Sequence, residues 1–188
     1  MPIIRLCANP QIGQGELVAH TQPKITAAAF RALAFEGVPY AGQLGCRIEH
    51  FRAGHVILRM PYQELLRRPG DTICGPALMT LADVTLYGVV LSMIGEIALA
   101  VTTDMTIHFL RRPALSDVLA TGRLLKLGRR LAVGEVLMHS DDDTEPICHV
   151  VGTYAIPPQP DREEIGNPGG PTRELAPEPE SAPGVDST

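Results

Sequence analysis

Residues 75–94 read GPALMTLADVTLYGVVLSMI, and this stretch decides the fold. Apolar side chains occupy nearly every face of the helix that it predicts, and Pro76 suits the first turn, where its missing N–H costs nothing. A helix that is apolar all round is normally buried on all sides, inside one domain or between subunits. The remaining sequence must therefore supply a surface that wraps around it.

The same stretch offers roughly 18 consecutive residues, which is about the length that crosses a bilayer. It carries Asp83 near its centre, and an ionisable side chain is costly at that depth in a membrane. We therefore expect a core helix and no membrane partner.

Antiparallel strands are predicted on both sides of this helix. Residues 46–62 alternate polar and apolar side chains around a turn at Ala53-Gly54, which indicates a hairpin. After Gly95 the periodicity is two, and it assigns residues 99, 101, 103, 105, 107 and 109 to one face of a long strand. Further strands are expected over residues 118–127, 131–139 and 147–156, and a short amphipathic helix over residues 23–35.

The order of these elements has no parallel βαβ alternation, so a doubly wound sheet is not expected. The 188 residues are 45% hydrophobic and 20% charged, which suits one globular domain and excludes collagen, coiled coil and a wholly disordered chain. We predict an α+β fold in which a curved antiparallel sheet wraps around one long central helix.

Both ends of the chain differ in composition from the middle. Residues 157–188 hold seven acidic residues against two arginines, are rich in proline and contain no aromatic side chain. Such a segment cannot bury enough apolar surface to offset its ordering entropy. We predict a poorly ordered leader over residues 1–22, a domain over 23–156 and a disordered tail over 157–188.

The composition also excludes several partners. The four cysteines lie far apart without a CxxC pair and the six histidines have no ligand spacing, so neither a disulfide framework nor a metal site is expected. The net charge of -5 argues against nucleic acid. No secretory signal precedes the domain, and a cytoplasmic location is expected.

Asp83 is the first candidate for chemistry. It lies within the apolar helix, and no lysine or arginine stands three or four residues away on either side. A carboxylate there must find hydrogen-bond donors, take up a proton or face a wet cavity. It is either a satisfied structural group or a functional one.

Gly75 is the second candidate, because the N-terminus of a helix presents free N–H groups to an oxygen that gains charge. An ordinary loop-to-helix glycine is the alternative. Eight residues of helix separate Gly75 from Asp83, about 12 Å, so one chain cannot bring both to the same reacting atom. If both act together, they come from two chains, and the active site lies at the interface of a homodimer.

Residues 70–83 (GDTICGPALMTLAD), residues 101–113 (VTTDMTIHFLRRP) and Gly128-Arg129 resemble the PaaI-like hotdog-fold acyl-CoA thioesterases. The resemblance implies a hotdog fold, hydrolysis of an acyl-CoA thioester, and no cofactor beyond the coenzyme A moiety of the substrate. It implies that Asp83 is the catalytic carboxylate, acting as nucleophile or general base. It also implies that the Gly75 amide polarises the thioester carbonyl.

The substrate-binding candidates follow from the same resemblance. The family's His-Gly-Gly helix start is Cys74-Gly75-Pro76 here, which keeps the Gly75 amide but removes one N–H and one polar side chain. Two threonines of the strand could position water, and two arginine doublets could contact the phosphates of coenzyme A, although each group could equally be ordinary polar surface. The substrate-binding candidates are Cys74, Pro76, Thr102, Thr103, Arg111, Arg112, Arg129 and Arg130.

The sequence therefore predicts a homodimer or homotetramer that hydrolyses a small-molecule acyl-CoA. A non-catalytic acyl-CoA-binding or regulatory protein is an alternative, because of the changes at Cys74 and Pro76. A hotdog hydratase or dehydratase is a further alternative, but that branch resembles a pattern with a histidine five residues after the aspartate, where this chain has Gly88. The acyl group itself stays open.

Overall fold

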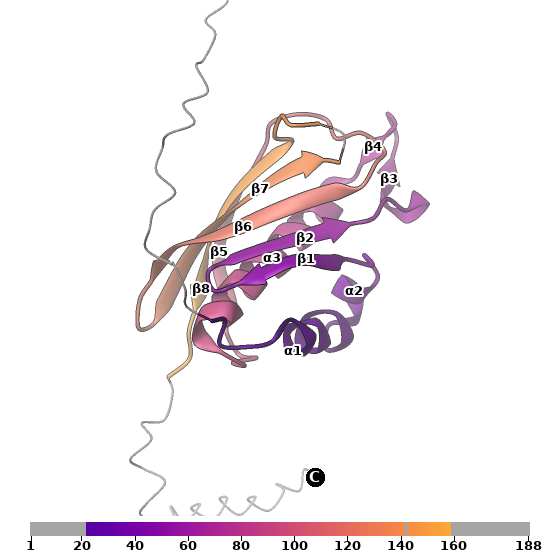
Figure 1. Ribbon diagram of the computed structural model, residues 1–188. Helices are drawn as coiled ribbons and strands as arrows, with labels where there is room; N and C mark the ends of the chain where they lie inside the picture. Colours follow the sequence, from indigo (N-terminus) through magenta and orange to yellow (C-terminus); the bar gives the residue numbers. More distant parts are fainter. Residues whose placement is uncertain (1–21, 142, 159–188) are drawn as a thin grey trace, which may run out of the picture. The chain divides into compact units, whose positions relative to one another are not determined.

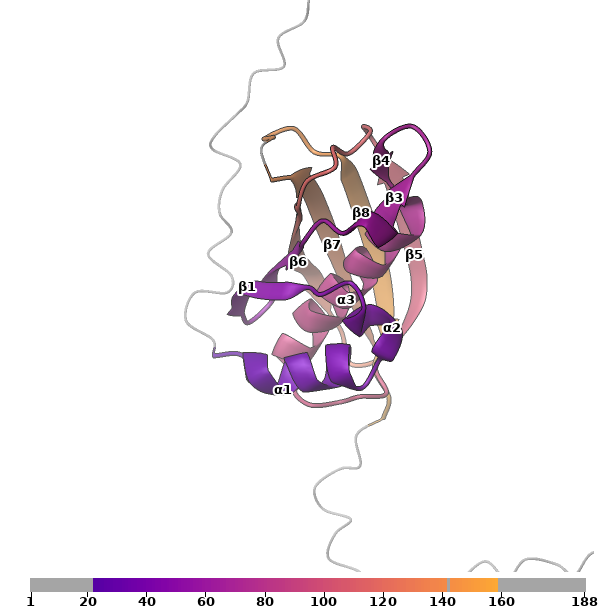
Figure 2. The ribbon, with the colours of Figure 1, turned by 90° about the vertical axis from the view of Figure 1, so that its right-hand side faces the viewer.

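Helix α3 (Gly75–Ile94) lies in the concave side of a six-stranded sheet that curves around it (Figures 1 and 2). The computed structural model describes residues 22–141 and 143–158. The strand order is β1-β2-β6-β7-β8-β5, and every neighbouring pair is antiparallel. The strands are β1 (Arg47–Arg52), β2 (His55–Met60), β5 (Val101–Phe109), β6 (Val118–Leu127), β7 (Leu131–Ser140) and β8 (Cys148–Ala155).

This architecture confirms the predicted α+β class and the sheet wrapped around a central helix. A 3-10 turn η3 (Glu64–Leu66) and a second small hairpin, β3 (Arg67–Arg68) with β4 (Thr72–Ile73), lead into α3. The predicted leader and tail lie outside the described residues, apart from residues 22, 157 and 158.

The central helix is buried along most of its length. Leu81, Leu86 and Leu91 are fully buried, and the buried hydroxyl of Thr85 donates to the Leu81 carbonyl within the helix. Within the described residues α3 is the one helix long and apolar enough to cross a membrane, and most of it is covered by the fold. The helix ends at Gly95, whose φ of 95° is readily adopted only by glycine.

Three glycines of the sheet allow α3 to lie directly on the strands. A Cβ on Gly152 of β8 would be 2.6 Å from a methyl of Leu86, and a Cβ on Gly134 of β7 would be 2.9 Å from the other methyl. A Cβ on Gly122 of β6 would be 2.7 Å from the Thr85 methyl. The sheet therefore fixes the depth of α3 just after Asp83.

A short helical segment covers one side of α3. It consists of α1 (Ala27–Arg31), a π-helical turn η2 (Ala32–Glu36) and α2 (Pro39–Gly42). The predicted helix over residues 23–35 is thus confirmed in part. It begins later than predicted because Thr26 caps it, accepting a hydrogen bond from Ala29 N–H. Helix α2 was not predicted from the sequence.

The segment is anchored by Phe30, which is fully buried. Its ring packs on Gly88 of α3, where a Cβ would approach it to 2.9 Å. Phe30 also stacks on Phe51 of β1, with ring centroids 5.3 Å apart. The helical segment is therefore held against both the central helix and the sheet.

Strand β5 departs from the predicted alternation. Its register with β8 shifts after Thr102, so that Thr102 lies opposite Tyr154 and Asp104 lies opposite Thr153. Thr103 is the extra residue of a β-bulge, which reverses the alternation at this point. The prediction that Thr102 lies on the face opposite residues 105, 107 and 109 is therefore wrong, because Thr102 reaches Asp83 on α3 and lines the same cavity as Met105.

Candidate active site

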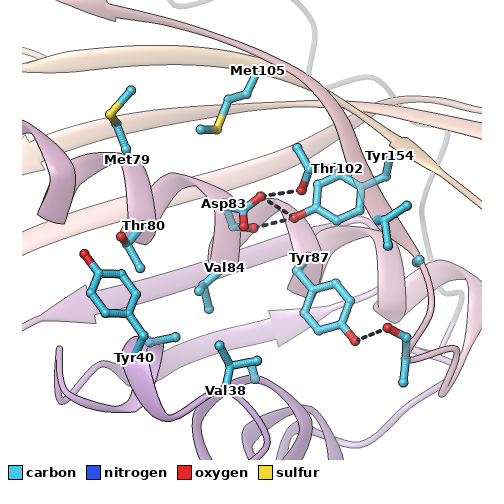
Figure 3. A pocket seen from close by; sticks show the side chains of 15 residues that line it. Val38, Tyr40, Met79, Thr80, Asp83, Val84, Tyr87, Thr102, Met105 and Tyr154 are labelled. Carbon is cyan, nitrogen blue, oxygen red and sulfur yellow. Dashed lines mark hydrogen bonds between the residues drawn. The ribbon is translucent and has the colours of Figure 1, made fainter. Parts of the chain in front are cut away.

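Asp83 opens into a cavity of about 680 Å³ between α3, the N-terminal helical segment, β5 and the end of β8 (Figure 3). The cavity wall is mainly apolar, with alanine, valine, methionine and tyrosine side chains. Met79 and Val84 of α3 and Met105 of β5 lie around the carboxylate, and Tyr40 of α2 lies on the opposite side of the cavity. A negative group thus stands in a largely apolar pocket.

Two hydroxyl groups hold this carboxylate. The Thr102 hydroxyl donates to Asp83 Oδ1 at 2.6 Å, and the Tyr154 hydroxyl lies 2.7 Å from the same oxygen (Figure 3). The Tyr154 hydroxyl is also 2.9 Å from the Asp83 main-chain carbonyl. No lysine or arginine pairs with Asp83 within residues 22–141 and 143–158. From the sequence, we expect this carboxylate to find hydrogen-bond donors, take up a proton or face a cavity. The fold gives it two donors and places it beside an open cavity.

Tyr154 is the polar residue of this site that the sequence did not reveal. It is 2% exposed, and burial, together with the charge of Asp83, raises the pKa of its phenol far above the usual value. The phenol therefore stays protonated and remains a donor. Alternation in β8 points Tyr154 toward the helix, but only the pairing of β8 with β5 brings it to Asp83.

Gly75 lies in a second cavity, of about 620 Å³, beside the β3–β4 hairpin and the end of β5. It is the first residue of α3, and Cys74 before it provides no side-chain cap. The Gly75 N–H has no acceptor in the described part of the chain. Phe109 covers the residue, about 3.6 Å from where a Cβ would stand. An unpaired amide at the positive end of a helix is suited to an oxyanion.

Arginines make this second cavity cationic. Arg111 and Arg112 line it, together with Arg68 of the hairpin, which the sequence did not single out. Arg111 is already paired with Asp143, at 2.6 Å, and with Glu145. Within the described residues Arg68 and Arg112 have no acidic partner, so their charges are available to an anionic ligand.

The second arginine doublet lies elsewhere. Arg129 and Arg130 form the turn between β6 and β7, at the end of the ladder where Leu127 pairs with Ala132. The doublet 111–112 is near the opposite end of that ladder, and a strand of this length spans about 30 Å. One protomer therefore does not bring the two doublets together.

The remaining predicted residues flank the two cavities. The Cys74 N–H donates to the Leu66 carbonyl at 2.8 Å, and Pro76 is exposed, with its carbonyl accepting from Thr80. Neither residue lines a cavity. The Thr103 hydroxyl donates to the Thr153 carbonyl at 3.1 Å on the neighbouring strand. Of the two threonines, only Thr102 reaches the carboxylate.

A curved antiparallel sheet around a buried helix, with a carboxylate in mid-helix and a free amide at its start, defines the hotdog class of thioester-processing folds. The profile of the thioesterase superfamily matches residues 70–147. A Silicibacter sp. TM1040 protein, provisionally assigned as a thioesterase, is 38% identical, with 77% of this chain and 97% of that chain covered and a TM-score of 0.64. This chain belongs to the thioesterase superfamily and has the hotdog fold.

Two further relatives are more distant. The PaaI protein of the E. coli phenylacetic acid degradation operon is 20% identical, with 69% of this chain and 97% of that chain covered and a TM-score of 0.59, a likeness of fold. A candidate esterase of Thermoplasma acidophilum is 24% identical over 110 residues, which are 58% of this chain and 81% of that protein. Hydrolysis is thus the activity class of the superfamily in which the chain falls.

Proposed function

We propose that this protein is an acyl-CoA thioesterase whose Asp83 drives hydrolysis and whose Gly75 amide stabilises the oxyanion. The observation that carries the proposal is a carboxylate without a cationic partner in the described chain, held by two hydroxyls at the wall of an apolar cavity. Such a group is accessible, charged and oriented, as a general base or nucleophile requires.

The two cavities suit the two halves of an acyl-CoA. The apolar cavity beside Asp83 accepts the acyl group, because its wall offers contacts to hydrocarbon and few polar groups. The cationic cavity beside Gly75 accepts the phosphate-bearing part, because Arg68 and Arg112 can donate charge-assisted hydrogen bonds to phosphate. The arginines at 129 and 130 could contact the same ligand only from another protomer.

A second copy of the chain completes the site. Asp83 and Gly75 stand about 12 Å apart along one helix. Strand β5 is an edge with an unpaired row of backbone groups, and Val101, Phe109 and Leu110 leave about half of their surfaces exposed there. Pairing of two β5 strands about a twofold axis would cover this edge and bring the Gly75 cavity of one protomer toward the Asp83 cavity of its partner. Either a dimer or a dimer of dimers satisfies this requirement.

The reaction then follows from the positions of the groups. With Asp83 as general base, the carboxylate takes a proton from water as the water oxygen attacks the thioester carbon. The partner's Gly75 N–H donates to the carbonyl oxygen as it becomes negative. Collapse of this intermediate breaks the C–S bond, and the leaving thiolate receives the proton, giving free acid and coenzyme A. With Asp83 as nucleophile, the carboxylate attacks the thioester carbon and the C–S bond breaks, which releases the coenzyme A thiolate and leaves an acyl-aspartyl anhydride. Water then cleaves this anhydride, which gives the free acid and restores the Asp83 carboxylate, and a proton from water passes to the thiolate.

The test is release of free thiol from short, medium-chain and aryl acyl-CoAs by the wild type and by Asp83→Asn. We expect the variant to lose about three or more powers of ten in kcat while its melting temperature stays close to that of the wild type, since loss of a catalytic base or nucleophile has such effects. Glu96→Gln is the matched control, because Glu96 is exposed, lines neither cavity and lies outside strand β5. Full activity in Asp83→Asn would refute the assignment.

Binding of acyl-CoA without thiol release by the wild type would instead identify a binding or regulatory protein. The departure at Cys74 and Pro76 is the feature that favours this second function, since both residues adjoin the amide that must polarise the carbonyl. Calorimetric titration with a non-hydrolysable acyl-CoA thioether measures binding separately from turnover.

A further inference from the structure

The two oxygens of the Asp83 carboxylate have different surroundings. Oδ1 accepts from Thr102 and lies within hydrogen-bond distance of the Tyr154 hydroxyl. Oδ2 has no donor among the residues that the structure describes. Both donors meet Oδ1, and Asp83 lines the apolar cavity (Figure 3), so Oδ2 is the carboxylate oxygen left for a ligand in that cavity.

The sheet produces this asymmetry. Thr102 and Tyr154 are direct partners in the β5–β8 ladder, and the bulge at Thr103 turns Thr102 onto the helix side where Tyr154 already lies. A pair of hydroxyls from adjacent strands therefore meets the same oxygen of a side chain on α3. The arrangement depends on residues that are 19 and 71 positions away from Asp83 in the sequence.

Tyr154 is rigid enough to orient its partner. The side chain is almost fully buried, and its ring stacks on Tyr87, with centroids 6.2 Å apart and an interplanar angle of 23°. The phenol has one proton and two acceptors within reach, Asp83 Oδ1 at 2.7 Å and the Asp83 main-chain carbonyl at 2.9 Å. The carboxylate oxygen is the nearer and the stronger acceptor, so the proton is donated mainly to Oδ1.

We infer that Tyr154 is a positioning residue of the active site, which holds Asp83 Oδ1 and presents Oδ2 as the oxygen that meets water or the thioester. This inference rests on the proposed function for its kinetic consequence, but the orientation of the carboxylate does not depend on it. Tyr154 acts through Asp83 and touches no reacting atom.

The kinetic test compares Tyr154→Phe with Tyr62→Phe. Tyr62 also donates to a carboxylate, that of Glu64 at 2.8 Å, but lines neither cavity, so it is the matched control. Loss of a hydrogen bond to a charged group predicts a fall in kcat of about tenfold to a hundredfold for Tyr154→Phe, with KM changed by less than about threefold.

An unchanged kcat, or a loss confined to KM, would overturn the inference. If Tyr154→Phe does not fold, Tyr154→3-fluorotyrosine keeps the ring and the hydroxyl while making the phenol a stronger acid. A kcat identical to that of the wild type would then also overturn it.

A spectroscopic readout separates this inference from the proposed function. In isotope-edited infrared spectra of the full protein, the Asp83 carboxylate band is the one that disappears in Asp83→Asn. We expect it to shift in Tyr154→Phe and to stay in place in Tyr62→Phe. If the wild type hydrolyses no acyl-CoA and the Asp83 band still shifts in Tyr154→Phe, the thioesterase function is refuted and the positioning role is upheld. An unshifted band would refute the positioning role whatever the activity.

Discussion

The two ends of the first half of α3 have opposite electrostatic character. Around Asp83 the protein offers an apolar cavity, two hydroxyl donors and, in the described chain, no cation. Around Gly75 it offers a main-chain amide at the positive end of a helix, beside the guanidinium groups of Arg68 and Arg112. In the function proposed above, the catalytic carboxylate and the site for the anionic part of the substrate lie on one helix, two turns apart.

On this proposal, the separation explains why a single protomer needs a second copy to complete its site. A carboxylate placed beside the arginines would form an ion pair and lose its availability as a base, whereas a carboxylate on the apolar side keeps an unpaired oxygen. The proposed thioester carbonyl, in contrast, needs the positive end of the helix. In the proposed dimer, a second copy related by a twofold axis would bring the two regions together around the substrate.

Replacement of Gly75 by proline removes the amide N–H. Among substitutions at the start of α3, we expect it to lower kcat the most. Cys74 has φ −72° and ψ 145°, the conformation that a residue before proline prefers, and proline is favourable at the first position of a helix. The fold should therefore persist, while kcat falls by about 100- to 1000-fold through loss of an oxyanion donor. Gly75→Ala keeps the N–H and should lose far less, as measured by thiol release.

Mixed dimers test directly whether Asp83 of one protomer acts together with Gly75 of its partner. A dimer that pairs one Asp83→Asn protomer with one Gly75→Pro protomer contains one site with both functional groups and one site with neither. Purified through two different tags, this heterodimer should recover about half of the wild-type rate, although each parent is nearly inactive. A heterodimer as inactive as its parents would show that the two residues do not act across an interface.

The next largest effect is on stability, because the sheet lies closer to α3 near Asp83 than the protein does near Gly75. A Cβ on Gly152 would lie 2.6 Å from Leu86 and 3.3 Å from the Asp104 carbonyl, so Gly152→Ala must displace α3 or β8 near Asp83. We expect a loss of about 1–3 kcal/mol in the free energy of unfolding, as overpacking causes. Urea unfolding at fixed protein concentration measures it, with Gly75→Ala as the comparison.

At Gly75 a Cβ would meet only Phe109, at 3.6 Å. Alanine also has the higher helix propensity, so Gly75→Ala should leave stability unchanged or slightly raised. Equal stability in Gly152→Ala and the wild type would mean that α3 is not tightly packed on the sheet near Asp83. The packing near Asp83 would then not differ from the packing near Gly75.

Most of the fold follows from local patterns. The apolar run of residues 75–94 predicts the central helix, and alternation predicts strands that agree with β1, β2, β6, β7 and β8 within a few residues. The first part of β5 departs from the predicted alternation, because a bulge is set by pairing with β8 and not by the strand's own sequence. The extra residue brings Thr102 onto the side of the sheet that faces α3.

The site was predictable only where its residues share one helix. Asp83 stands out within α3, and Gly75 lies at its start, so their spacing could be worked out from helix geometry alone. Tyr154 and Arg68 enter the two cavities through strand pairing and through a hairpin that folds toward the helix start. No local pattern marks such contacts, which arise from segments far apart in the chain.

The smallest predicted effect separates the two cavities by ligand. Arg112→Ala should raise KM for an acyl-CoA by about two- to fivefold, which is the value of one exposed charge pair. The same variant should leave KM unchanged for the N-acetylcysteamine thioester of the same acid, because that substrate carries no phosphate. Initial rates of thiol release at low and moderate salt measure both constants, and the difference between wild type and variant should shrink as salt screens the charges. An equal change in KM for both substrates would mean that Arg112 acts on the acyl group or on the fold, and the cationic cavity would lose its assignment to the phosphates.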